Sequence, residues 1–382
     1  MVVPILSLVL AALAILSIVL LFWQWLAARS FPLHRQPPAL SDAPPISLLK
    51  PLKGAGDSLE HCLRSWLEQD YPGPVQVLLG VESADDPAVP IVEKLRRAFP
   101  QRKIELVICT ELRGPNFKIS KLAKLEPRAT SEILVVSDAD VRVPPNLLNG
   151  LVTGLAGARV GMVNCLYRLA NPSTLAMQWE AIATNADFWS QVLQSRSLKA
   201  VDFGLGAVMA LRRRNLHEVG GFESLENCLA DDYHLGNRLA GRGYRIEFCP
   251  LVVECWSEPT TWALAWRHQL RWARTIRVCQ PVPYFFSILS NPTFWPLVWT
   301  ISAPAPVTFG FLAAAILTRG VVVMDLEQRL SGASPPLNRF WLAPLKDLLQ
   351  FGIWLGAFLG NHIEWRGTRM RLKSDGTITL TS

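Results

Sequence analysis

Two aspartates one residue apart follow a short apolar segment near the middle of the chain. Ile133–Val136 is a run of four apolar, mostly β-branched residues, which is typical of a strand buried on both faces. Asp138 and Asp140 come just after it. Ligands of open α/β sheets bind outside the carboxyl ends of the strands. Two carboxylates there would suit Mg²⁺ or Mn²⁺ bound with a phosphate-bearing substrate, because hard cations take oxygen ligands. For such a pair alone, an Asx-type turn is the competing interpretation.

Two further acidic pairs and one basic helix stand elsewhere in the chain. Glu82–Asp86 follows another apolar run, and Asp231-Asp232 opens a later helical segment, where the helix dipole alone would favour acidic residues. Trp262–Arg277 is predicted to be a helix that carries five basic residues and three tryptophans. Such a helix beside apolar segments is typical of a membrane surface.

Strands and helices alternate in the first half of the chain, which predicts a doubly wound α/β domain with a mostly parallel sheet. The expected strands are Ile46–Leu49, Val75–Val81, Ile104–Cys109 and Ile133–Val136, and the expected helices are Asp57–Glu68 (capped by Asp57), Pro87–Phe99 and Lys118–Leu125.

The pattern is looser after Asp140. Thr174–Leu198 is predicted to be one long helix, which either packs on the domain or lies on the membrane surface. Phe203–Leu211 is apolar and contains Gly204 and Gly206, but no third glycine that would complete a dinucleotide-binding fingerprint. We expect these glycines to allow a close backbone approach to a ligand or a neighbouring strand.

Long apolar segments lie near both ends. Val2–Leu26 is long enough to span a bilayer, and the basic residues after it predict an N-terminus outside the cytoplasm. Tyr284–Met324 could form two spans, whereas Phe340–Leu359 is a weaker candidate because it contains Lys346 and Asp347. Four spans would leave the basic C-terminal segment outside, whereas its charge favours the inside, so one segment is expected to lie along the interface.

The composition agrees with a membrane-associated protein. Half of the residues are apolar, and the formal charge of +7 is spread along the chain or beside apolar segments. This pattern favours anionic lipid head groups and a phosphorylated substrate over nucleic acid as partners. Seven cysteines without C-x-x-C spacing predict reduced thiols in a cytosolic domain, with no structural zinc.

The order of these motifs resembles a known family. The matching stretches are Ser47–Gly54, Asp70–Pro72, Asp85–Ala88, Asn116–Lys118, Asp138, Ala230–Tyr233 and the Arg271-Trp272 pair, all between Ile46 and Arg277. The chain resembles the membrane-bound inverting glycosyltransferases with a GT-A fold. It is most similar to the ceramide glucosyltransferase family and its bacterial relatives, including hopanoid-associated glycosyltransferases.

The resemblance implies roles for individual residues. Asp138 would lie near the ribose of a UDP-sugar, Asp140 would hold Mg²⁺ or Mn²⁺ at the diphosphate, and Asp232 would be the general base. Glu82 or Asp85 would contact uracil, since Ser83 stands where the family has an aspartate. Arg271 would meet the diphosphate, and Trp272 would offer a flat face to the acceptor or sugar; His268 departs from the family's Gln or Arg. Lys53 and Lys118 would contact the nucleotide or be solvated surface lysines.

These inferences predict a glycosyltransferase in a multi-pass membrane protein, in the inner membrane of a bacterial source, with its catalytic domain in the cytoplasm. It would move glucose or N-acetylglucosamine from a UDP-sugar to a lipid hydroxyl such as that of ceramide or a hopanoid. A processive polysaccharide synthase and a non-catalytic membrane-binding or transport protein are the alternatives. The expected segments are an anchor (1–28), a linker (29–45), the GT-A domain (46–261), an interface helix (262–281), membrane helices (282–362) and a basic tail (363–382).

Overall fold

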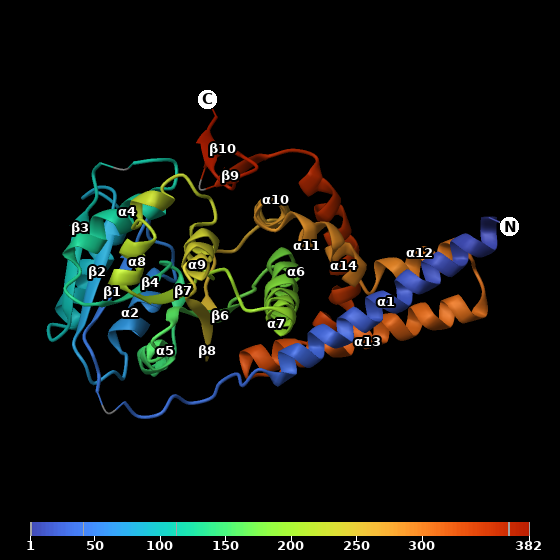
Figure 1. The fold of residues 1–382 in the computed structure, drawn as a ribbon, viewed down its shortest axis with the longest axis horizontal. Coiled ribbons are helices and arrows are strands. Elements are labelled where there is room, and N and C mark those ends of the chain that lie inside the picture. The colour runs from blue at the N-terminus through green and yellow to red at the C-terminus, as the bar shows by residue number, and fades with distance from the viewer. Residues whose placement is uncertain (1, 41, 112, 366, 382) are drawn as a thin grey trace.

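The computed structural model describes every residue except 1, 41, 112, 366 and 382. An α/β body occupies one side of the molecule, and a helical arm formed by α1, α12 and α13 projects from it (Figure 1). The strands are β1 (Ile46–Pro51), β2 (Val75–Val81), β3 (Lys103–Ile108), β4 (Ile133–Ser137), β5 (Val141–Arg142), β6 (Val160–Leu169), β7 (Val208–Arg212), β8 (Arg245–Cys255), β9 (His362–Trp365), β10 (Thr368–Leu372) and β11 (Ile378–Leu380).

The helices occupy both faces of the sheet and the arm. They are α1 (Val2–Ser30), α2 (Leu59–Leu67), α3 (Ala88–Ala98), α4 (Phe117–Leu125), α5 (Leu147–Leu155), α6 (Leu175–Ile182), α7 (Trp189–Leu198), α8 (Arg213–Glu218), α9 (Asp231–Gly241), α10 (Trp262–Cys279), α11 (Pro281–Phe286), α12 (Phe294–Ser302), α13 (Pro306–Ser331) and α14 (Asn338–Phe358).

The main sheet has the strand order β3-β2-β1-β4-β7-β6-β8-β5. Strands β1 to β4 run parallel, as does the β6–β8 pair, whereas β7 is antiparallel to both of its neighbours and β5 to β8. The predicted α/β class and mostly parallel sheet are therefore confirmed. Strands β1, β2 and β4 are buried on both faces, so their residues are mostly apolar instead of alternating with exposed polar ones. The polar side chains among them, Ser47, Lys50, Gln76 and Ser137, are buried as well.

Two hydrophobic cores lie on opposite faces of this sheet. Helices α2, α3 and α5 pack on one face, around Leu48, Val77 and Val135. Helices α4, α7 and α9 pack on the other, around Leu49, Leu78 and others, together with the ends of α1 and α13. The predicted cap at Asp57 is wrong, because α2 begins at Leu59 after Ser58, and the Asp57 amide donates to Glu258 Oε1 (2.8 Å).

The segment predicted as one long helix from Thr174 to Leu198 contains a π-helical turn, Ala183–Phe188, between α6 and α7. This turn has a function in packing. Asn185 accepts a hydrogen bond from the Leu169 amide (2.7 Å) and donates one to the Leu169 carbonyl (3.0 Å), which ties the helix to the end of β6. Turns of this kind often mark functional sites, and this one also carries the buried Asp187.

Two helices, Ile5–Ser30 and Pro306–Ser331, are long and apolar enough to cross a membrane by length and composition. They run in the same direction. Trp299, just before α13, donates to Ser7 near the start of α1 (3.1 Å), and Arg29 at the end of α1 pairs with Asp325 (2.9 Å). Within Tyr284–Met324, the second predicted span corresponds to α13, whereas the first is not one long helix. The first is divided into α11, a 3₁₀ turn and the nine-residue α12, which is ~14 Å long against a ~30 Å hydrocarbon core.

Helix α14, the weaker predicted span, lies against α10, α13 and the α/β body. Its two central charges belong to a buried ion cluster, defined here as Asp187, Arg319, Lys346 and Asp347. The Arg319 guanidinium lies 2.9 Å from Asp187 Oδ1 and 2.8 Å from Asp347 Oδ1, and the Lys346 ammonium also pairs with Asp187. Lys346 and Asp347, which made this segment a weaker candidate for a membrane span, thus take part in ion pairs that hold α13 and α14 to the α/β body.

The expected basic tail is in fact folded. Strands β9, β10 and β11 form a small antiparallel sheet whose inner side chains, Met370 and Leu372 among them, pack on Leu229. Its basic residues follow the alternation of a strand and face outward. The Ile378 amide donates to the Asn227 carbonyl (2.8 Å), so this segment lies on the α/β body rather than across a membrane from it.

Candidate active site

The predicted aspartates at the end of β4 meet a lysine from α4. The Lys118 ammonium lies 2.9 Å from Asp138 Oδ1 and 3.2 Å from Asp231 Oδ2, so one cation joins the two acidic motifs. Burial disfavours the charged form of Lys118, but the charges of Asp138, Asp231 and Asp232 outweigh that effect and raise its pKa above the ordinary value. Lys118 is therefore a fixed positive charge rather than a solvated surface lysine.

Asn116 positions this lysine. Its side-chain oxygen accepts hydrogen bonds from the amides of Lys118 (3.1 Å) and Ile119 (3.2 Å), which caps α4. Its amide nitrogen donates to the Cys228 carbonyl (2.8 Å) and to Asp231 Oδ1 (3.3 Å). One buried side chain thus sets both the start of α4 and the approach to α9. Asn116 and Asp231 were not predicted as site residues. For Asp231, its place beside Asp232 in an acidic pair was the feature of the sequence that could have indicated it.

Asp232, the predicted general base, lies in the first turn of α9. Burial, reinforced by the charge of Asp231, raises its pKa from 3.8 to about 6, although Lys118 opposes the shift. Its Oδ1 accepts a hydrogen bond from the Tyr233 amide (2.8 Å). A carboxylate with this pKa is largely ionised at neutral pH and still basic enough to accept a proton.

The two glycines before β7 make room for Asp232. A Cβ at Gly206 would lie 2.9 Å from Asp232 Oδ2, and one at Gly204 would lie 2.4 Å from the Asp232 carbonyl oxygen. The expected close approach is present, but its partner is the start of a helix rather than a strand. Gly236 of α9 completes the contact, since its Cβ would meet the Gly204 amide nitrogen at 2.2 Å.

A buried lysine supports the Asp138 backbone. Lys50 on β1 donates to the Asp138 carbonyl (2.6 Å) and to Ser137 Oγ (3.1 Å), and its ammonium lies 4.9 Å from the Trp66 ring centre. Burial lowers its pKa to about 8, with Cys62 and Asp138 opposing the shift. Lysine within an apolar strand is a signal that sequence reasoning could have used, because such a residue is rarely buried without a partner.

A cavity opens where these elements meet. It is lined by strand ends, by α4 and, unexpectedly, by the C-terminal sheet; the residues are Pro51, Lys53, Pro115, Phe117, Lys118, Lys121, Asp138, Trp365, Thr368 and Met370. The structure thus brings Lys53, Lys118 and Asp138 together, as predicted for nucleotide contacts. The aromatic ring of Trp365 and the charges of the two lysines suit a base and a diphosphate.

Glu82 and Asp85 are exposed on the loop after β2 and do not contribute to the lining of that cavity. The neighbouring Asp86 has a structural role. Its Oδ1 accepts hydrogen bonds from the Gly54 amide (3.0 Å) and the Ala88 amide (2.9 Å), which fixes the turn after Lys53 and the start of α3. The uracil contact assigned to Glu82 or Asp85 stays a prediction.

The Arg-Trp motif lies on α10. The Trp272 ring packs against the rings of Tyr167, Phe188 and His268, with centroid separations of 6.5, 5.7 and 5.2 Å. His268, the departure from the family motif, hydrogen-bonds to Glu180 on α6. Arg271 lines a second cavity, between α10 and the C-terminal sheet, instead of the one that contains Asp138.

The residues present fit a divalent cation that is held mainly by its substrate. The described residues contain no group of three or more His, Cys, Asp or Glu side chains arranged for a metal. The Asp138 carboxylate pairs with Lys118, and the Asp140 side chain is exposed at the carboxyl end of the strand, where a substrate phosphate could share a cation with it. Mg²⁺ and Mn²⁺ commonly bind through one or two carboxylates, with phosphate oxygens and water as the other ligands. Asp140 is therefore the carboxylate suited to such an ion.

Replacing Lys118 by methionine tests this network. Loss of the cation leaves Asp138 and Asp231 unpaired, and we expect the KM for the donor to rise roughly ten- to hundredfold, as for other lost charged hydrogen bonds. Lys124→Met on the same helix is the control, because Lys124 is 39% exposed and lies 3.7 Å from Glu111. Equal donor KM values for the two variants would remove Lys118 from the donor site.

Comparison with known proteins agrees with this geometry. Probable glycosyltransferase YdaM of Bacillus subtilis is 25% identical over 313 residues, which cover 78% of this chain and 70% of that protein. Ceramide glucosyltransferase 3 of Caenorhabditis elegans is 24% identical over 222 residues, 58% of this chain and 48% of its own length. The ceramide glucosyltransferase of Gibberella zeae is 30% identical over 142 residues, 34% of this chain and 27% of its own length. The chain therefore spans half or less of these two ceramide glucosyltransferases.

A solved structure shares the fold. The mannosyltransferase PcManGT from Pyrobaculum calidifontis, determined in complex with GDP-Man and Mn²⁺, superposes with a TM-score of 0.51 at 22% identity, over 91% of this chain and 99% of that one. The fold is thus that of a GT-A glycosyltransferase. The model of the family described as Glycosyl transferase family 21 matches residues 9–378, which include both acidic motifs, the Arg-Trp helix and most of the C-terminal sheet. The chain is accordingly a glycosyltransferase that belongs to glycosyl transferase family 21.

Proposed function

We propose that this enzyme transfers a hexose, glucose or N-acetylglucosamine, from a UDP-sugar to a hydroxyl group of a membrane lipid, with inversion at the anomeric carbon. The observation that carries the proposal is the half-buried Asp232, whose pKa is raised to about 6 beside the Lys118–Asp138 pair. A base of that strength next to a fixed cation is what attack by an alcohol on a sugar diphosphate requires. The matched ceramide glucosyltransferases and an N-acetylglucosaminyltransferase of Rhizobium leguminosarum support the choice of sugars.

Asp232 takes the proton from the acceptor hydroxyl as its oxygen attacks the anomeric carbon, and the bond to the UDP oxygen breaks on the opposite face. Because the carboxylate is held by the Tyr233 amide and the glycine segment leaves its other oxygen uncovered by a side chain, Oδ2 is the atom that receives the proton. One nucleophilic displacement inverts the anomeric configuration.

As the bond between the sugar and UDP breaks, negative charge develops on the diphosphate, and positive charge nearby stabilises it. Lys118 and Lys53 supply it from the cavity wall, and Lys50 holds the Asp138 backbone in place beneath them. Asp140 would hold Mg²⁺ or Mn²⁺, which adds positive charge beside the diphosphate when bound. Trp365 would close the cavity over the nucleotide.

The acceptor is proposed to be a lipid, ceramide- or hopanoid-like, because the helices outside the α/β body expose many apolar side chains. Helices α1 and α13 would anchor the arm in the membrane, with the α/β body in the cytoplasm. Large apolar side chains of α11 and α14 are also exposed, including Phe285 (52%), Phe286 (55%) and Trp341 (67%). These helices would lie in the interface, so that a lipid reaches Asp232 from the side.

A panel of UDP-sugars offered with extracted lipids tests the proposal, with product masses as the readout. We expect one hexose to be added per lipid in the presence of Mg²⁺ or Mn²⁺, and activity to disappear with EDTA. Asp140→Asn should raise the metal concentration for half-maximal activity at least tenfold. A polymeric product would favour a processive synthase instead, and transfer that is indifferent to EDTA would remove the metal role of Asp140.

A further inference from the structure

Tyr167 lies at the edge of the main sheet that carries the candidate active site. It is close to the carboxyl end of β6, and the pairing of β6 with β8 is irregular just before it, between Cys165 and Tyr167. Irregularities of this kind often re-aim a side chain beside an active site. The Tyr167 ring packs against both hydrophobic cores, which lie on opposite faces of the sheet, so this residue stands where the two faces meet.

The strand register relates Tyr167 to the proposed general base. Strand β7 lies between β4 and β6 and is antiparallel to both, so its amino end meets their carboxyl ends. Asn164 of β6 pairs with Met209 of β7. Continued three residues further, this register places Tyr167 level with Gly206. A Cβ at Gly206 would lie 2.9 Å from Asp232 Oδ2, so the base and Tyr167 belong to the same part of the sheet edge.

Asp138 borders the same space from the other side of β7. Its amide donates to the carbonyl of Ala207, the residue after Gly206 (3.4 Å). Adjacent strands lie about 4.8 Å apart, so β4 and β6 are separated by roughly 10 Å across β7. In the proposed reaction Asp138 lies beside the diphosphate and Asp232 takes the proton, so the hexose lies between them. Tyr167 therefore borders the space that the hexose would occupy.

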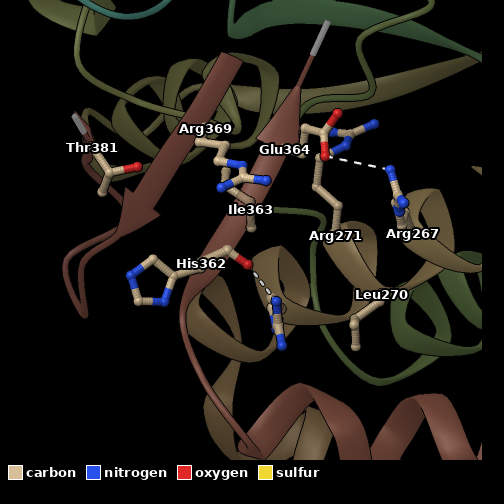
Figure 2. A pocket seen from close by; sticks show the side chains of 9 residues that line it. Arg267, Leu270, Arg271, His362, Ile363, Glu364, Arg369 and Thr381 are labelled. Carbon is tan, nitrogen blue, oxygen red and sulfur yellow. Dashed lines mark hydrogen bonds and ion pairs between the residues drawn. The ribbon is translucent and has the colours of Figure 1, made fainter. Parts of the chain in front are cut away.

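Aromatic neighbours from two helices hold the Tyr167 ring. Its centre lies 5.4 Å from that of Phe188, the last residue of the π-helical turn, and 6.5 Å from that of Trp272 on α10. Arg271, beside Trp272, faces the cavity between α10 and the C-terminal sheet instead (Figure 2). Asn185 ties the π-helical turn to the end of β6. The turn thus helps to fix both the backbone and the ring of Tyr167.

The hydroxyl group of Tyr167 has no protein partner. Within the described part of the chain it makes no hydrogen bond, and its oxygen is not among the buried atoms that lack a partner, so a ligand can reach it. The other four tyrosines each donate to a carbonyl or a carboxylate; they are Tyr71, Tyr233, Tyr244 and Tyr284. Burial, reinforced by Cys255, Asp232 and Asp138, raises the pKa of Tyr167 well above its usual value, so the hydroxyl keeps its proton and can donate.

We propose that the Tyr167 hydroxyl donates a hydrogen bond to an oxygen of the transferred hexose, which makes Tyr167 a further donor-binding residue. The inference rests on the proposed function and adds a contact to the sugar itself, whereas Lys53 and Lys118 serve the nucleotide diphosphate. The acceptor oxygen is a ring hydroxyl or the carbonyl of an N-acetyl group, since either accepts a hydrogen bond from tyrosine. UDP lacks the sugar and would not use this contact.

Tyr167→Phe tests the proposal, because it removes the hydroxyl and keeps the ring and its packing. The full-length protein in a non-ionic detergent with Mn²⁺ is titrated calorimetrically with UDP-glucose, UDP-N-acetylglucosamine and UDP. We expect the variant to bind the preferred UDP-sugar roughly three- to tenfold more weakly, the loss typical of one neutral hydrogen bond. Its affinity for UDP should stay within about twofold of the wild type, and its midpoint of heat denaturation should not change.

Tyr244→Phe is the matched control. It also removes one hydroxyl, which donates to Glu218 (2.8 Å) just before β8, at the opposite end of the sheet, and it should leave all three affinities unchanged. Equal losses for UDP and UDP-sugar in Tyr167→Phe, or no loss for either, would overturn the proposal. A rise in the KM for the lipid alone would assign the hydroxyl to the acceptor and overturn it too.

These outcomes are separable from a failure of the proposed function. If the wild-type protein bound neither UDP-sugar, the proposed function would be contradicted together with the role of Tyr167. If the wild-type protein bound a UDP-sugar and Tyr167→Phe bound it equally well, the role of Tyr167 alone would be contradicted.

Discussion

Asp232→Asn is expected to lower kcat by roughly 10²–10⁴-fold, the contribution typical of a positioned general base, while UDP binding is retained. Asparagine has nearly the shape of aspartate and can still accept the hydrogen bond from the Tyr233 amide, but it cannot take the acceptor's proton. Steady-state kinetics with separate measurement of UDP affinity checks this expectation. A variant with near-normal kcat would exclude Asp232 as the base.

The same substitution should stabilise the folded protein. The pKa of Asp232 rises from 3.8 to about 6 on folding, so the ionised carboxylate is disfavoured in the native state. Above pH 6 this costs about 3 kcal/mol, whereas below pH 3.8 both states are protonated and the cost vanishes. We therefore expect Asp232→Asn to raise the denaturation midpoint at pH 8 and to have little effect near pH 4. Lower stability at pH 8 would contradict the assigned pKa.

The pH dependence of the wild-type rate follows from the same group. A base with a pKa of about 6 loses its proton as the pH rises through that value, so kcat should increase roughly tenfold per unit below pH 6 and level off above it. Lys118→Met should move this limb to higher pH, because Lys118 opposes the upward shift in the pKa of Asp232. A limb that stays in place would indicate that another group controls it.

Arg319→Met is expected to cause the largest loss of stability. The Arg319 side chain is 3% exposed and contacts both Asp187 and Asp347, so its removal leaves two buried carboxylates with Lys346 as their remaining cation. Breaking one partner of a buried ion network costs roughly 3–5 kcal/mol. The midpoint of heat denaturation, followed by tryptophan fluorescence in one detergent, should fall by several degrees.

Arg29→Met is the matched control, because it breaks an ion pair that α13 makes at the surface, with α1. Arg29 and Asp325 are 45% and 30% exposed, and such pairs contribute about 1 kcal/mol or less. If both variants had the same midpoint, the buried cluster would not be what fastens α13 to α14 and the π-helical turn.

The features of the fold that could be predicted are those determined by residues close together in the sequence. The alternation of strand-like and helical segments predicted a mostly parallel sheet, and Asp138 could be placed at a strand end because the apolar run Ile133–Val136 stops just before it. The role of Asp232 was predicted from the resemblance to the ceramide glucosyltransferase family, because the helix dipole by itself would also explain an acidic pair at the start of a helix. The strand pattern and the position of Asp138 depend on residues that are neighbours in the sequence, so both can be predicted without the tertiary structure.

The features that were missed depend on distant contacts. Met370 and Leu372 alternate with arginines, so the segment resembles a solvated basic tail until Leu229 supplies the surface that buries them. The charges in α14 weakened it as a membrane span, but only Arg319 and Asp187 explain why they are buried. Similarly, the role of Lys50 is explained only by its hydrogen bond to the carbonyl of Asp138, which is 88 residues away in the sequence.

The C-terminal sheet has a consequence for the biosynthesis of the enzyme. Trp365, Thr368 and Met370 complete the wall of the Asp138 cavity, yet they are translated after helices α1 to α14, which include α1 and α13, long enough to cross a membrane. A nascent chain whose α/β body has already folded at the ribosome therefore lacks part of the wall of this cavity. The proposed donor site would therefore be complete only after the apolar helices have left the ribosome and β9 and β10 have paired on the body.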